Sequence, residues 1–323
     1  MWKTVARRFL ILIPQMFVMS IVIFILANMM PGDALSGLID PTLSPEALQV
    51  QRELLGLDRP LHERYITWIR GIVFEFDFGN SFTHRRPVTE LMAERIMNTL
   101  WLSIAILVMT YLIAIPLGIL AGRYRGTPID KGVLIYIMLA MSMPTMVLAI
   151  VSILFFAFWL GWFPPVGSVN PIILATGTPF EIFLNRVHHM ILPTMVGAIL
   201  GTMGTIYMLR ANIIDRTYSD YVTLARSKGV PTGTIFRRHI LRNSLIPITA
   251  DFGFAIAFLI TANVFIENIF VYPGIGNLFV TAINQRDFAV VNAIVILFAF
   301  AIVIGALISD ILLTIVDPRI RIQ

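Results

Sequence analysis

The chain contains no cysteine and little charge. Without a thiol, disulfide bonds, cysteine catalysis and thiolate metal sites are all excluded. Charged residues make up only 13% of the 323 positions, hydrophobic residues make up 57%, and the mean hydropathy is +0.83. These values lie well outside the range of ordinary soluble domains. The composition therefore predicts an integral membrane protein.

Sequence motifs for catalysis are also missing. No G-x-x-x-x-G-K-[ST] occurs, so the chain cannot build a phosphate-binding loop for ATP by itself, and neither H-E-x-x-H nor G-x-S-x-G is present. His188 and His189 adjoin each other, but neighbours on a helix point about 100° apart, and no second ligand cluster accompanies them. The sequence thus predicts no catalytic residue, no metal and no cofactor bound by this chain.

The net charge of +5 and the pI near 9.7 raise the question of nucleic-acid binding. The basic residues, however, stand in short blocks between apolar runs, where the orientation of the chain in a bilayer explains them better. We therefore expect membrane lipid, and no nucleic acid, to contact the chain.

Uncharged runs of about 20 residues, the length needed to cross roughly 30 Å of hydrocarbon, predict transmembrane helices. We expect six, at residues 9–30, 98–122, 133–160, 190–209, 247–270 and 288–316. Residues 1–30 would form the cytoplasmic N terminus and the first span, 31–97 an extracytoplasmic helical cap, and 98–323 a core with the other five spans. The first run is longer than a typical signal-peptide apolar region, so we expect it to be retained.

The loops predict the sidedness of the chain, because cytoplasmic loops carry an excess of Lys and Arg. Lys and Arg gather before the first span, in residues 123–131, in residues 210–246 and after the last span, whereas the two short loops on the other side carry one each. Both termini are therefore expected in the cytoplasm.

The predicted cap (residues 31–97) has helix signals of its own. Residues Ser44 to Gly56 read as a capped helix with Pro45 at its first position. Apolar residues then recur at helical spacing from Leu61 to Phe76, and the turn residues of DFGNSF (77–82) end that pattern.

Few ionisable residues interrupt the predicted spans. They are Asp251, Glu267 and Asp310. Acidic groups inside a membrane are costly and often functional, so a proton relay is one interpretation. Placement at helix ends, paired with a neighbouring helix or a partner subunit, is the alternative that we favour.

Small and sulphur-containing residues mark the predicted third and fourth spans. Gly197 and Gly201, with Gly204 continuing the face, would allow another helix to approach closely. Met138, Met141, Met143 and Met146 surround Pro144, and they suit helix packing or an adaptable channel wall. Prolines in or at the ends of spans are tolerated where neighbouring helices satisfy the freed carbonyls.

The stretch YVTLARSKGVPTGTIFRRHILRNSLIPI (221–248) is basic and contains no acid. It predicts a short helix to Lys228, an elbow at Gly229–Pro231, and a second helix, capped by Thr232, to about Leu241. A helix-elbow-helix suits a docking lever, whose apolar residues fill a pocket on a soluble partner while its basic rim orients that partner. A loop lying on anionic headgroups is the alternative.

This stretch resembles the cytoplasmic EAA loop of permease subunits from ABC importers of the dipeptide and oligopeptide permease family. The likeness covers almost the whole chain, through PGDALSGLIDPTLSPEALQVQRELLGLDRPLHERYITWI, DFGNSF, FIENIFVYPGIGNLFVTAINQRDFAVV and the closing DPRIR. Thr223 stands at the usual Glu and Arg242 at the usual Pro, which puts in doubt any contact assigned to that Glu.

The resemblance implies a non-catalytic permease subunit in the inner membrane of a bacterium or archaeon. A similar, non-identical second permease would complete the channel as a heterodimer, two cytoplasmic ABC ATPases would hold ATP and magnesium, and an extracytoplasmic solute-binding protein would deliver peptides. Nickel chelates, glutathione and oligosaccharides are alternative cargoes, and an ion-coupled secondary transporter is a further alternative. The ATPase-coupling loop would comprise Ala225, Arg226, Lys228, Gly229, Thr232, Ile235, Phe236, Arg237, Arg238, His239, Ile240 and Leu241.

Overall fold

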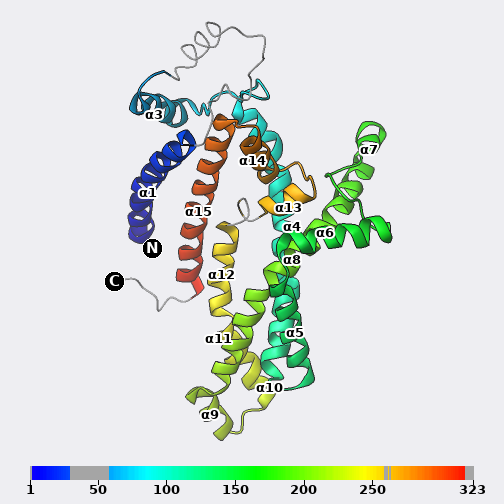
Figure 1. The fold of residues 1–323 in the computed structure, drawn as a ribbon. Coiled ribbons are helices and arrows are strands. Elements are labelled where there is room, and N and C mark those ends of the chain that lie inside the picture. The colour runs from blue at the N-terminus through cyan, green and yellow to red at the C-terminus, as the bar shows by residue number, and fades with distance from the viewer. Residues whose placement is uncertain (1, 30–57, 258–260, 262, 317–323) are drawn as a thin grey trace.

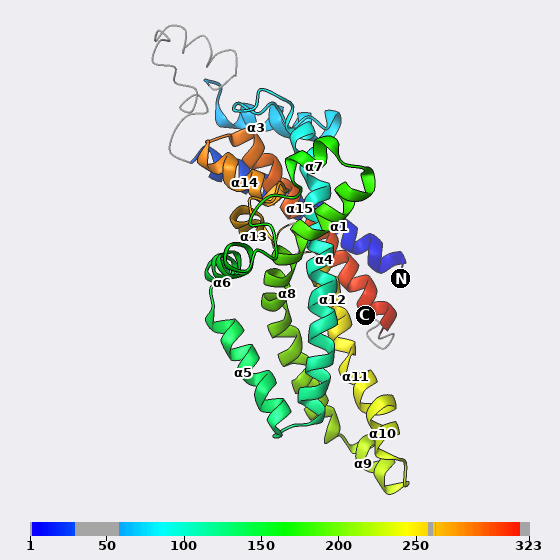
Figure 2. The same ribbon diagram turned by 90° about the vertical axis from the view of Figure 1, so that its right-hand side faces the viewer.

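The computed structural model describes residues 2–29, 58–257, 261 and 263–316, and helices dominate these ranges (Figure 1). Within them, extended pairing is confined to one antiparallel bridge between Asn80 and Pro87. The molecule is elongated, and two long helices, α4 (Val88–Arg123) and α8 (Pro179–Thr217), run along its centre (Figures 1 and 2). The predicted all-helical fold is confirmed.

Three helical stretches of the described chain are long and apolar enough to cross a membrane. They are Val88–Arg123, Pro179–Thr217 and Phe288–Ser309, and the bent pair Pro128–Ser142 and Thr145–Trp159 is a fourth candidate. The predicted spans 98–122 and 190–209 thus lie inside longer helices, since α4 and α8 continue beyond the apolar runs at both ends. The last predicted span, 288–316, has the bounds of α15 (Phe288–Val316).

Glycines bring α4 and α8 into close contact. A Cβ at Gly118 would lie 3.0 Å from the Leu209 Cβ, and a Cβ at Gly122 would lie 2.8 Å from the Ile213 Cβ. Further along, a Cβ at Gly197 would lie 2.7 Å from the Cδ1 of Ile106. The predicted close approach at the fourth span is confirmed, and its partner is α4.

Gly204 does not extend this contact surface. A Cβ added there would meet nothing within 4 Å. The expectation that Gly204 continues the contact of Gly197 and Gly201 is wrong, because Gly204 is exposed and the neighbouring helices do not reach it, although seven residues from Gly197 bring it back to nearly the same side of α8.

The third predicted span, 133–160, is broken in the structure. Helix α5 (Pro128–Ser142) ends before Pro144, and α6 (Thr145–Ser152) starts after it at an angle of 100°. Met143 is extended (φ −100°, ψ 118°) because a residue before proline is pushed out of the helical region. The π-helix η2 (Ile153–Trp159) continues from α6. The prediction of a continuous helix here is wrong.

The fifth predicted span, 247–270, is interrupted as well. It is represented by α12 (Ile246–Ala257) and α13 (Val264–Ile269), with Thr261 and Asn263 in turns between them. The largely apolar run predicted one helix, but apolar composition alone does not report a break of this kind.

The first helix, α1 (Trp2–Asn28), begins earlier than the predicted run at 9–30 and packs along α15 (Figure 1). Helix α3 (Leu61–Arg70) and the π-helix η1 (Gly71–Glu75) confirm the helical spacing predicted for residues 61–76. Tyr65 of α3 bonds to the Ser20 hydroxyl at 2.8 Å and packs its ring on Phe24. The predicted helix Ser44–Gly56 and the closing DPRIR lie outside the described residues.

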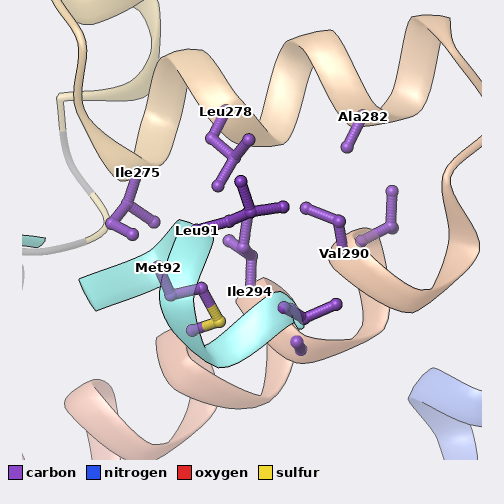
Figure 3. Close-up of a cluster of buried hydrophobic side chains, with 10 residues drawn as sticks. Leu91, Met92, Ile275, Leu278, Ala282, Val290 and Ile294 are labelled. Atoms are coloured by element: carbon purple, nitrogen blue, oxygen red, sulfur yellow. The ribbon is translucent and has the colours of Figure 1, made fainter. Parts of the chain in front are cut away.

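DFGNSF (77–82), a non-helical segment as predicted, is tied to the start of α15. The Ser81 hydroxyl donates to the buried Asp287 carboxylate at 2.5 Å, and the Thr83 N–H donates to the same oxygen at 3.2 Å. Beside this contact, α14 (Ile275–Asn284) packs with α4 and α15 around Leu91, Leu278 and Ile294 (Figure 3). Segments about 200 residues apart in sequence therefore form one end of the molecule.

We predict that Gly122→Ala separates α4 from α8, because the new methyl group would overlap the Ile213 Cβ, which cannot move without its backbone. Overpacking of this kind costs about 1–3 kcal/mol. Thermal unfolding of the purified protein in detergent should show a lowered midpoint. The matched control, Gly204→Ala, has open space and a gain in helix propensity, so its midpoint should hold or rise. Equal midpoints for the two variants would contradict the close contact.

Candidate functional site

The basic stretch forms a helical projection at the end of the molecule remote from α3 and α7 (Pro171–Thr176), as both views show (Figures 1 and 2). We use "the projection" for residues 220–244. It contains four elements: α9 (Asp220–Ser227), α10 (Thr232–Ile235), the π-helix η3 (Phe236–Leu241) and α11 (Arg242–Ser244).

The elbow between α9 and α10 is a Schellman motif. The Val230 N–H donates to the Ala225 carbonyl at 3.2 Å, and the Gly229 N–H donates to the Arg226 carbonyl at 3.0 Å. Gly229 has φ +73°, and a Cβ there would meet nothing within 4 Å. Its role is therefore the left-handed backbone angle, which a side chain disfavours, and not close approach to a neighbour.

The second half of the projection departs from the prediction in two ways. Thr232 is the first helical residue and makes no capping bond; Pro231 precedes it at the N-cap. The helix also does not stop near Leu241, since η3 passes through α11 and the helical backbone of Leu245 into α12. Residues 242–245 carry no glycine or proline that would end it.

The inner side of the projection is apolar and packed on the chain itself. Val222, Ile235 and Ile240 are buried together with residues of α8 and α12, namely Leu209, Ile213 and Ile248. Ile240, expected among the apolar residues that fill a pocket on a partner, is instead 96% covered by its own chain, and Ile235 is covered as well. They hold the projection in place.

The expected coupling residues divide into three groups by burial. Arg226, Lys228, Gly229, Thr232, Arg237 and Arg238 are exposed; Ala225, Phe236, His239 and Leu241 are half-buried; Ile235 and Ile240 are buried. The outer side of the projection is therefore cationic and its inner side apolar. Phe236 connects the projection to the end of α4, because the Arg123 guanidinium lies over its ring at 4.9 Å.

An ion pair connects α8 to α5 beside Leu209 and Ile213, the α8 residues that pack against the projection. Arg210 donates through Nε to Asp130 Oδ1 at 2.6 Å and through Nη2 to Asp130 Oδ2 at 2.9 Å. The Gly126 N–H adds a third bond to Asp130 at 2.8 Å. Asp130 is 3% exposed and lies before the predicted span 133–160.

Glu267 is buried and caps a helix. Its Oε2 accepts the N–H groups of Gly276 at 2.7 Å and Asn277 at 3.2 Å, at the start of α14. A Cβ at Gly274 would overlap the same oxygen, so the carboxylate needs this glycine. The arrangement supports the helix-end interpretation of Glu267. Asp251 and Asp310 lie on α12 and α15.

The histidine pair makes backbone contacts. His188 Nε2 lies 2.9 Å from the Trp162 carbonyl, and His189 Nδ1 lies 2.9 Å from the Asn185 carbonyl. The part of the chain that the structure describes holds no group of three or more His, Asp or Glu side chains able to bind a metal.

Sequence reasoning missed Asp130 and Asp287. Both are nearly fully buried acids whose partners lie far away in sequence, at Arg210 and Ser81. The available signal was their position: each stands in or just before the first turn of a helix, where a carboxylate is favoured.

Comparison with known proteins gave matches over almost the whole chain. Residues 114–322 match the family described as binding-protein-dependent transport system inner membrane component, and residues 1–103 match its N-terminal family. The oligopeptide transport system permease protein AppB of Bacillus subtilis (strain 168) is 35% identical over 318 residues, 98% of each chain. The glutathione transport system permease protein GsiC of Escherichia coli (strain K12) is 32% identical over 323 residues, 99% of each chain.

We predict that Gly229→Ala loosens the projection, since a left-handed angle costs a residue with a Cβ about 1–2 kcal/mol. Amide hydrogen exchange of residues 220–241 should become about tenfold faster. Gly233→Ala is the matched control, because Gly233 lies in α10 without a positive φ and its Cβ would meet nothing. Unchanged exchange in Gly229→Ala would show that the elbow does not depend on the glycine angle.

Proposed function

The chain belongs to the family of binding-protein-dependent transport system inner membrane components, and from this premise we propose that it is one permease subunit of an ATP-driven peptide importer. The oligopeptide permease relative supports peptides as cargo. The glutathione permease relative is compatible with the same class, because glutathione is itself a small peptide, and it makes glutathione the second candidate.

We propose a topology of six spans with both termini in the cytoplasm. The bent pair α5–α6 and the interrupted pair α12–α13 would each count as one span, joined by α1, α4, α8 and α15. The start of α1 and the end of α15 lie at the same end of two packed helices, towards the projection (Figure 1). The basic residues of the projection support a cytoplasmic position for that end.

The observation that carries the proposal is the construction of the projection. A loop that merely lay on headgroups would need positive charge and nothing more. Here the elbow is fixed by a Schellman motif, and Ile235 and Ile240 are buried against α8. Force applied to the exposed side, at Arg237 and Arg238, would therefore move α8 and α12 with it.

In this proposal the projection engages one of two cytoplasmic ATPase subunits, which hold ATP and magnesium, while a similar second permease completes the channel and a solute-binding protein delivers the cargo. Binding of ATP can shift the permease between inward and outward states only through its different affinity for them. A contact between the ATPase and a rigid projection that changes between the two states would supply this difference in affinity.

Transport by the complex purified with its neighbouring subunits tests the function. In liposomes, uptake of labelled trialanine or glutathione should require ATP and the binding protein, and should survive a proton uncoupler. Uptake that is independent of ATP but abolished by the uncoupler would instead indicate a secondary transporter working through Asp251, Glu267 or Asp310.

We predict that the double variant Arg237→Glu and Arg238→Glu slows association with the ATPase, most strongly at low salt, because exposed rim charges are screened by ions. Association rates measured across a salt series would show the effect. Arg85→Glu with Arg286→Glu is the matched control, with the same change of charge on exposed residues at the other end of the molecule. Rates that match the wild type at every salt concentration would favour the membrane-surface interpretation.

A further inference from the structure

The Asp130–Arg210 ion pair joins two elements that the chain separates by 80 residues. Asp130 lies in the first turn of α5, and Arg210 lies on α8 between Leu209 and Ile213, the two residues of that helix that pack against the buried side of the projection. Three hydrogen bonds of 2.6–2.9 Å converge on the Asp130 carboxylate, two from the guanidinium and one from the Gly126 N–H.

A contribution to folding stability is not enough to explain why the chain has the Asp130–Arg210 ion pair. Taking two charges out of water costs about as much as their attraction returns, and apolar residues of similar volume often serve as well. What a bidentate pair adds is geometry, because two parallel hydrogen bonds fix both the distance and the relative rotation of the groups. The pair therefore makes a defined joint between α5 and the part of α8 against which the projection packs.

The rest of α5 is packed on the same helices. Val133 and Ile137 are buried against α4 and α8, and the Tyr136 hydroxyl bonds to that of Thr202 on α8 at 2.8 Å. The opposite face of α5, with Ile135 and Met138, is exposed. One side of α5 is thus attached to α8 along its length and at its end.

The far end of α5 is separated from α6 by a sharp break. Met143 and Pro144 lie between two helices at 100°, and α6 then packs with α13 and α8 around Ala149, Leu192 and Ile266. A break of two residues is the kind of place where backbone angles can change without disturbing either helix.

We propose that Asp130 and Arg210 are positioning residues that make α5 move as one body with the projection, with the Met143–Pro144 break as the hinge. The proposal rests on the function proposed above. Displacement of the projection by an ATPase would then carry the exposed face of α5, which includes Met138 and Met141, with it. The Met143–Pro144 break would absorb the difference between α5, which is held near Arg210 of α8, and α6, which is held near Leu192 of the same helix.

Distance measurements test whether α5 and the projection move together. Because the chain has no native cysteine, only the introduced cysteines would be labelled. Spin labels at Gly132→Cys and Ser227→Cys, both exposed positions, report the distance from α5 to the projection. In the full complex this distance should be the same without nucleotide and with trapped ATP, while the distance from Ser227→Cys to Thr176→Cys on α7 should change. A change of the first distance in the otherwise wild-type chain overturns the proposal.

Breaking the pair tests its effect on coupling. In Asp130→Asn, the Gly132–Ser227 distance should differ between the two states, and trialanine or glutathione transported per ATP hydrolysed should fall about tenfold. Arg210→Lys keeps the charge but loses the bidentate geometry, and it should show the same defect; it also serves if Asp130→Asn does not fold. A merely structural pair would lower thermal stability and leave the transport ratio unchanged, which also overturns the proposal.

Glu94→Gln is the control for loss of an ion pair, because Glu94 pairs with Arg86 at an exposed site. Its transport ratio should equal that of the wild type. ATP-driven uptake by the wild-type complex tests the proposed function separately: if uptake is present but the variants keep the wild-type ratio and distances, the inference fails and the function stands.

Discussion

The close contact between α4 and α8 is the constraint on which the other features depend. Helices in a membrane gain little from hiding apolar surface, since lipid is as apolar as their side chains, and they associate through close packing. Gly118 and Gly122 supply that packing at one end of the pair and Gly197 at the other. The projection, α5 and α6 all pack against α8, so each inherits its position from this contact.

Breaks in the helices create polar backbone groups that must be satisfied where water is scarce. Side chains from other segments supply the hydrogen bonds. Glu267 accepts from the backbone at the start of α14, and Asn98 donates to the Pro273 carbonyl at 2.9 Å. Asp287, in the turn after α14, accepts from Ser81 of DFGNSF. These hydrogen bonds give the buried acids Glu267 and Asp287 a structural role.

Much of the architecture could be predicted from the sequence, because the apolar runs indicate where long helices lie and the short basic blocks indicate the loops between them. The helical spacing from Leu61, the elbow at Gly229 and the close approach at Gly197 follow from local signals and were found. The break at Pro144 was missed because a proline in a membrane helix also fits a mild kink, and only the packing of α6 on α13 decides between them. The inward side chains of Ile235 and Ile240 were missed because periodicity defines an apolar face without naming what covers it. Asp130 and Arg210 meet only through the fold.

The passage from the projection into the membrane contains no linker: α10, η3, α11, Leu245 and α12 follow one another with helical backbone throughout. Each residue of a helix turns its successor by about 100°. An insertion or deletion of a single residue between Arg238 and Ile248 would therefore swing the outer cationic side around the axis relative to the buried side of α12. In the evolution of this gene, amino-acid substitutions along the segment should accordingly be tolerated far more readily than insertions or deletions.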